Sequence, residues 1–157
     1  MLDFATTDLT LAIAHHLLIF LLAGILAFEI GVIRLTMTAT DIVRAGRVDI
    51  WYGILAALII VVGFSRAIFA AKGWAYYSVN LFFWAKMACF AVVGLLSIMP
   101  TMRIIQWRRT LADKESFAPA GDDIRSVRRY LWAEVVFFAF IAAFAAVMAR
   151  GYGSLAH

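Results

Sequence analysis

Ionisable side chains interrupt long apolar stretches at four places in this sequence: His15 with His16, Arg66, Lys86 and Glu134. A charge near the centre of a bilayer costs roughly 2.5–3.5 kcal/mol, so such a group is usually kept where something compensates it. We therefore expect these side chains to converge on a site. Imidazole can bind a metal or carry a proton, and fixed positive charge favours an anionic ligand.

The composition is that of a membrane protein. The chain has 157 residues, of which 65% are hydrophobic and 15% are charged, and its mean hydropathy is +0.92. Soluble domains are closer to half apolar, so the sequence predicts one polytopic membrane domain over residues 1–157. The single cysteine, Cys89, can form neither an internal disulfide nor a cysteine metal cluster.

Four apolar stretches are each long enough to cross a hydrocarbon core of about 30 Å at 1.5 Å per residue. We place them at approximately 9–33, 49–71, 81–104 and 129–149. The predicted fold class is therefore all-α, an integral membrane four-helix bundle. Residues 105–128 are predicted to form a cytoplasmic linker, into which the third helix could continue over 104–111 and whose middle, 113–123, should be mobile. Pro100 is predicted to kink or end the third helix.

The basic residues indicate how the bundle is oriented. The first and third connections are rich in arginine, so the positive-inside rule places both in the cytoplasm and both termini on the extracytoplasmic side. The first ten residues contain no lysine or arginine, so we expect no cleavable signal peptide. The net charge is +4. We expect the basic residues at the helix ends to orient the protein in the membrane and to contact lipid headgroups, and we expect no nucleic-acid partner.

In this orientation the ionisable groups form two layers. His15 and His16 lie about 10 Å below the outer surface at the normal helical rise, Arg66 late in the second helix, and Lys86 early in the third. Because adjacent residues are about 100° apart, only one histidine is expected to face a given cavity directly. Arg66 and Lys86 could instead extend toward lipid headgroups.

The inner layer is acidic, with Glu29, Asp49 and Glu134. We expect these carboxyl groups to pair with arginines and hold the helix ends in register, with proton handling as the alternative. The nearby arginines are Arg34, Arg103, Arg128 and Arg129.

Several ligands suit the cationic outer layer. In haem b, imidazole could ligate the iron while cations contact the propionates. A quinone headgroup, a carboxylate substrate or a phospholipid headgroup would also fit. The aromatic residues near the second connection are interpreted as an interfacial belt rather than a ligand cage. They are Trp74, Tyr76, Tyr77 and Trp84.

The sequence also resembles known families. Several motifs resemble those of a bacterial membrane family known as domain of unknown function 2214. These are Lys72-Gly73, Tyr76-Tyr77, Asn80, Phe83 and Lys86, His15-His16 with Glu29, Leu95-Leu96-Ser97 before Pro100-Thr101, and Met148-Ala149-Arg150-Gly151-Tyr152-Gly153. The resemblance covers nearly the whole chain and implies a multi-pass protein of the bacterial inner membrane.

A more distant resemblance is to HemJ-type protoporphyrinogen oxidases and CopD-like membrane proteins. It implies a role for a first-helix histidine, for Lys86, and for Arg129 with Glu134. The sequence departs from the HemJ pattern at Ala133-Glu134-Val135-Val136, where HemJ-type proteins carry Asn-Glu-x-Pro.

Together these features give three hypotheses. The first is a haem-binding or porphyrin-related redox protein, with His15 or His16 as axial ligand and Arg66 and Lys86 as anion contacts. A second axial ligand could come from a homo-oligomer. The second hypothesis is a small proton-coupled transporter, and the third is a non-catalytic subunit or assembly partner of another membrane complex.

Overall fold

The computed structural model describes residues 4–69, 73–114 and 116–153. These residues form the helices α1 (Phe4–Val32), α2 (Ala39–Phe69), α3 (Gly73–Ser78), α4 (Leu81–Asp113) and α5 (Gly121–Ala149). The helices α1, α2, α4 and α5 are long and apolar enough to cross a membrane. The prediction of an all-α fold with four spans is confirmed. Which side the termini face stays a prediction.

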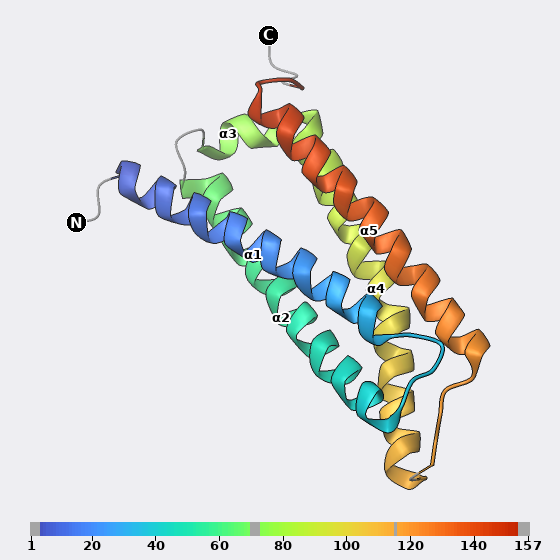
Figure 1. Ribbon diagram of the computed structural model, residues 1–157. Helices are drawn as coiled ribbons and strands as arrows, with labels where there is room; N and C mark the ends of the chain where they lie inside the picture. Colours follow the sequence, from blue (N-terminus) through green and yellow to red (C-terminus); the bar gives the residue numbers. More distant parts are fainter. Residues whose placement is uncertain (1–3, 70–72, 115, 154–157) are drawn as a thin grey trace.

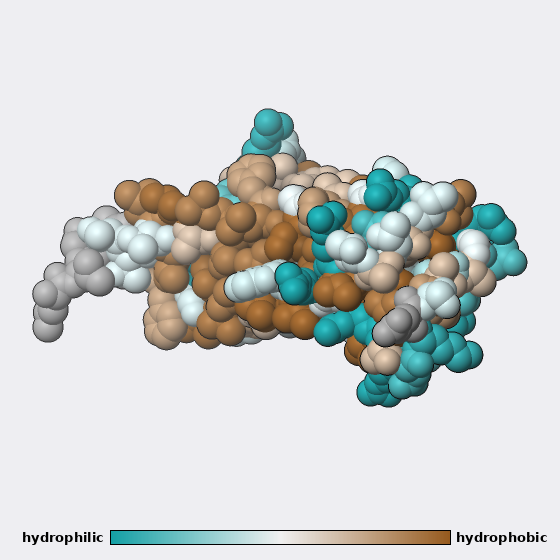
Figure 2. Space-filling model, turned by 60° about the horizontal axis from the view of Figure 1, so that its bottom comes forward, coloured by the Kyte–Doolittle hydropathy of each residue, from teal (hydrophilic) through white to brown (hydrophobic). Residues whose placement is uncertain are grey.

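The four long helices form two hairpins, α1–α2 and α4–α5, and the most extensive contacts lie within each hairpin. Figure 1 shows the hairpins converging at one end and diverging toward the other. We call the first the basic end, because it carries the α1–α2 turn and the α4–α5 connection. The other is the terminal end, where the first and last described residues and α3 lie. Figure 2 shows hydrophilic residues gathered over the basic end, beside a broad hydrophobic surface.

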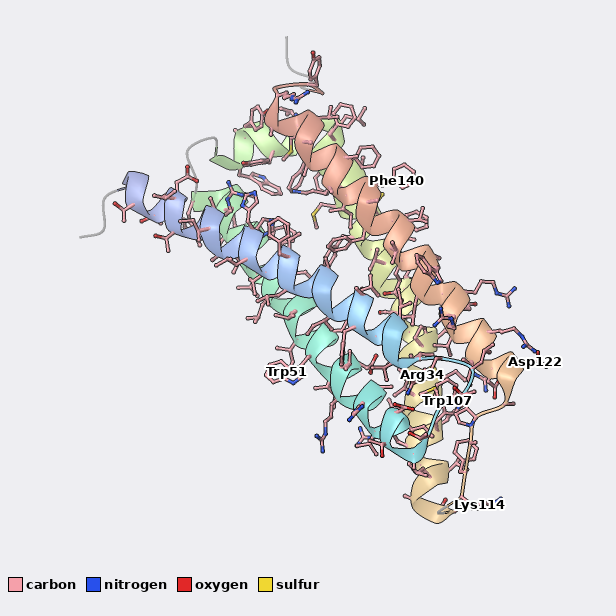
Figure 3. The ribbon with its side chains drawn as sticks, in the orientation of Figure 1. Arg34, Trp51, Trp107, Lys114, Asp122 and Phe140 are labelled. Carbon is pink, nitrogen blue, oxygen red and sulfur yellow. The ribbon has the colours of Figure 1, made fainter. Side chains whose placement is uncertain are left out.

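The hydrophobic core occupies the half of the bundle nearer the basic end. On α1, the first described residue that is buried is Leu22, and buried positions continue to Ile33. By contrast, many large apolar side chains cover the outside. In Figure 3, Trp51 of α2 and Phe140 of α5 point away from the bundle, and their exposed fractions are 58% and 48%. Such a surface suits contact with lipid tails.

Helix α2 begins ten residues before the predicted span at position 49. Thr38 and Asp41 form a reciprocal cap: the backbone N–H of Thr38 donates to Oδ2 of Asp41 (3.0 Å), and the backbone N–H of Asp41 donates to Oγ1 of Thr38 (3.3 Å). This arrangement satisfies donors at the helix start. Arg34 pairs with Asp41 at 3.4 Å. The end of the predicted span 49–71 and Lys72 lie outside the described residues.

Most of the connection at 105–128 is helical, because α4 continues to Asp113 and α5 begins at Gly121. Helix α4 continues through Pro100, so this proline does not end the helix; a membrane helix can tolerate proline when neighbouring groups compensate. The extra turns are stabilised by buried side chains at helical spacing. On α4 the buried residue is Trp107, and on α5 they are Ile124 and Val127.

At the terminal end, the predicted loop from Lys72 to Asn80 contains the short helix α3. Asn80 joins three segments here. Its Oδ1 accepts from the backbone N–H groups of Phe82 and Phe83 (3.0 and 3.2 Å), which caps α4, and its Nδ2 donates to the carbonyl of Tyr152 (3.1 Å). The N–H of Leu81 also donates to the carbonyl of Gly153 at 2.9 Å. The last described residues, Tyr152 and Gly153, are thus fixed against the start of α4.

Candidate functional site

A cavity of about 420 Å³ lies in the terminal half of the bundle, where the two hairpins diverge. All five helices contribute to its wall, and we call it the terminal cavity. Its lining is mainly apolar and aromatic, including Ile19, Ile59, Phe90, Phe138 and Ile141. Its size lies in the range of pockets that hold small molecules, about 300–1,000 Å³.

The four residues predicted for the outer layer all line this cavity: His15 and His16 on α1, Arg66 on α2 and Lys86 on α4. The structure therefore brings together imidazoles and fixed positive charges from three helices. Arg66 and Lys86 are half-buried, and Nε of Arg66 is buried without a hydrogen-bond partner. The ammonium of Lys86 lies 5.3 Å from the centre of the Phe83 ring. No aspartate or glutamate lies among the residues described as lining the cavity.

Both histidines line the terminal cavity. Their rings lie edge to face, with centroids 6.3 Å apart. Gly63 of α2 leaves space for His15, since a Cβ at this position would lie 3.2 Å from Cε1 of the imidazole. A glycine at this point allows close approach of α1 and α2.

The two imidazoles have different hydrogen bonding. Nδ1 of His16 lies 2.6 Å from the carbonyl oxygen of Ala12. Because a carbonyl can only accept, the neutral ring carries its proton on Nδ1 and its free lone pair on Nε2. Nδ1 of His15 is buried and has no hydrogen-bond partner. Nε2 of His16 is therefore left for a ligand, whereas Nδ1 of His15 is buried on the side of Gly63.

Sequence reasoning missed part of the cavity wall. Tyr76 and Tyr77, interpreted as part of an interfacial belt, line the terminal cavity together with Met87 and Met148. Trp74 and Trp84 are exposed, as expected of a belt. The methionines had no distinguishing feature in the sequence, but Met87 directly follows Lys86 and could have been noticed as a neighbour of a candidate ligand contact.

The predicted acidic layer lies between the terminal cavity and the basic end. Glu29 is 1% exposed and Glu134 is 0% exposed, whereas Asp49 is half-buried. We call these three residues the carboxyl cluster. The hydroxyl of Tyr52 donates to Oε2 of Glu134 at 2.8 Å, and that of Thr101 donates to Oδ1 of Asp49 at 2.6 Å. Sequence reasoning identified the acids but neither hydroxyl.

The expected pairing of these acids with arginines is wrong. Within the described parts of the chain, no ion pair involves Glu29, Asp49 or Glu134. The arginines have other partners or none. Arg34 pairs with Asp41, Arg103 pairs with Asp123 at 3.6 Å, and Arg128 donates to two backbone carbonyls of the α1 terminus. Arg129 is exposed, away from Glu134, which is buried.

No group of three or more histidine, cysteine, aspartate or glutamate side chains in the described residues is arranged to hold a metal ion. The two imidazoles of the terminal cavity could therefore ligate a metal only together with ligands of another kind, such as the nitrogens of a porphyrin.

Comparison with known proteins gives one match. A family model described as a predicted membrane protein matches residues 7–153. No curated protein matches the chain significantly, and no solved structure does so either. The match spans every helix from α1 to α5, with both the terminal cavity and the carboxyl cluster inside it. The chain belongs to the DUF2214 family of predicted membrane proteins.

Proposed function

We propose that this protein binds haem b or a related porphyrin in the terminal cavity and serves a redox function there. The supporting observation is the convergence of two imidazoles, a guanidinium and an ammonium on one largely apolar cavity, with no acid in its described lining. An amphipathic molecule with an apolar plane and carboxylate substituents matches both features. Uncompensated cations in such a cavity are costly, so an anionic ligand would stabilise the fold.

The cavity residues suggest how such a ligand would be held. His16 through the lone pair on Nε2, or His15, would ligate the iron. Lys86 and Arg66 would bind the propionates. The thioether of Met87 or Met148, both of which line the cavity, would be able to supply a further ligand from this chain. Bound haem would supply one-electron transfer, while the apolar wall excludes water.

The test is a visible absorption spectrum of the protein purified in mild detergent, before and after addition of haem. We expect a haem spectrum that changes when the protein is reduced. The variant His16→Ala is compared with His15→Ala to identify the ligand, since loss of an axial imidazole shifts the spectrum. A wild-type protein that stays colourless after haem addition would overturn the proposal, as would co-purification of a quinone instead.

The anion contacts are tested with Lys86→Met, which keeps the length of the side chain and removes its charge. We expect weaker haem retention with preserved helix content. Lys114→Met is the matched control, because Lys114 is exposed at the α4 C-terminus at the basic end. Equal haem affinity in the two variants would show that Lys86 does not contact the ligand.

Proton-coupled transport is the second candidate. It is favoured by one observation: ionisable groups occupy two separate regions along the same four helices, the terminal cavity and the carboxyl cluster. Proteoliposomes loaded with a pH-sensitive dye would test it. Proton flux that depends on an added organic anion would support transport, and flux unaffected by any anion tested would contradict it.

A further inference from the structure

The carboxyl cluster is separate from the terminal cavity. Glu29 lies fourteen residues after His15 on α1, which corresponds to about 21 Å at the helical rise. Glu29, Asp49 and Glu134 are absent from the described lining of the cavity. Whatever the cavity binds, this cluster needs its own explanation.

The cluster contains buried oxygen atoms that have no donor. Oε1 of Glu29 and Oε1 of Glu134 are both buried without a hydrogen-bond partner. Buried polar atoms in folded proteins are satisfied in the great majority of cases. The two unsatisfied carboxyl oxygens, on α1 and α5, are exceptions that need an explanation.

The surroundings of Glu29 add negative rather than positive charge. Asp49 on α2 and Glu134 on α5 both act on it electrostatically. The other polar groups are hydroxyls, from Tyr52 on α2 and Thr101 on α4. Since the described ion pairs include none of the three acids, full ionisation would leave two buried negative charges and one half-buried negative charge uncompensated. Such charges are very costly without a positive partner.

The positive partner is more consistent with a proton than with a metal ion. Divalent metals require several oxygen ligands converging at 2.0–2.6 Å, as a general rule. The described acids do not form such a group. A proton needs only one carboxylate, and the cluster provides three carboxyl groups.

We propose that the carboxyl cluster is a proton-binding site, in which Glu29 and Glu134 hold the proton and Asp49 connects them to the basic end. Asp49 is half-buried, and it lies three residues before Tyr52 on the same face of α2. Proton uptake converts one carboxylate to a neutral acid, and release returns the proton to water. No electron is transferred. The site works in this way whether or not the terminal cavity binds a porphyrin.

The test uses dicyclohexylcarbodiimide, an apolar reagent that reacts with protonated carboxyl groups in membrane proteins. The full-length protein in mild detergent is treated at a series of pH values, and modified residues are located by mass spectrometry. We expect label on Glu29 or Glu134 that is lost as the pH is raised. Asp122, whose side chain is 92% exposed, is the internal control and stays unlabelled.

A second measurement covers the case in which the reagent does not reach the cluster. Infrared difference spectra between low and high pH should show the carbonyl stretch of a protonated carboxyl group. Glu29→Gln or Glu134→Gln should remove that band, and Lys86→Met should keep it. If the wild type gives neither label nor band, the proposal is overturned. Protection of the label by sodium at constant pH would also overturn it, because a metal cation would then be the occupant.

Discussion

The hydroxyl of Tyr52 on α2 donates a hydrogen bond of 2.8 Å to Oε2 of Glu134 on α5. Both residues are buried, and they are separated by 82 positions in the sequence. The bond links the two helix hairpins near the middle of the bundle, and it fixes one carboxyl oxygen of the carboxyl cluster.

Replacing Tyr52 by phenylalanine removes this bond and leaves both oxygens of Glu134 without a donor. An unsatisfied buried acceptor costs about 1–3 kcal/mol, so we expect the free energy of unfolding to fall by that amount. Unfolding in mixed detergent micelles measures the change. Tyr130→Phe is the control, since Tyr130 lies at the surface of α5; equal losses in both variants would contradict a role for the bond.

Asn80 gives a prediction about the terminal end. Asn80→Ala removes the cap of α4 and the bond to Tyr152, so we expect a loss of about 1 kcal/mol and faster hydrogen exchange at 150–153. Asn80→Asp keeps the capping oxygen but lacks the Nδ2 donor. It should preserve most of the stability while still releasing the chain end. Unchanged exchange in both variants would show that Asn80 does not hold this segment.

Two glycines of α2 form a matched pair. A Cβ at Gly63 would lie 3.2 Å from Cε1 of His15, whereas a Cβ at Gly53 would meet nothing within 4 Å. Gly63→Ala should displace the imidazole and weaken binding at the terminal cavity. Gly53→Ala should leave binding unchanged and stabilise the helix by up to about 1 kcal/mol. Haem titration and thermal unfolding distinguish the two effects, and identical titrations would contradict the proposed contact.

Arg128 has a structural role that its neighbour lacks. Its Nη1 donates to the carbonyls of Ile30 (2.8 Å) and Ile33 (2.5 Å) at the end of α1, where helix carbonyls have no partner within the helix. We expect Arg128→Met to lower the unfolding free energy by about 1–3 kcal/mol. Arg129→Met, at an exposed position, should change it little. A larger effect at Arg129 in unfolding experiments would reverse this assignment.

The sequence predicted the spans well because their length and apolarity depend on local composition alone. Their ends were less predictable, because they depend on packing between helices. Val127 lies in the stretch predicted as a linker, yet it is buried on α5, which begins eight residues before the predicted span at 129. Spacing of three and four residues between apolar positions was a usable signal there.

The residues of the candidate site were also only partly predictable from the sequence. Helix depth correctly grouped His15, Arg66 and Lys86, because depth follows from counting residues along a helix. Charge sign did not predict the partners of the acids, since Arg128 binds backbone carbonyls instead of Glu29 or Glu134. Backbone carbonyls at a helix end compete with carboxylates for the arginine side chain. The order of charges along the sequence does not show which acceptor the arginine will bind.

The divergence of the two hairpins at the terminal end means that the cavity wall is divided between two bodies. His15 and Arg66 belong to one hairpin, and Lys86 belongs to the other. A molecule that contacts residues of both hairpins would hold the hairpins closer together at the terminal end. Without it, the two hairpins would lie farther apart. Ligand binding could then be measured as a change in the distance between probes attached to α1 and α5, with no need for an activity assay.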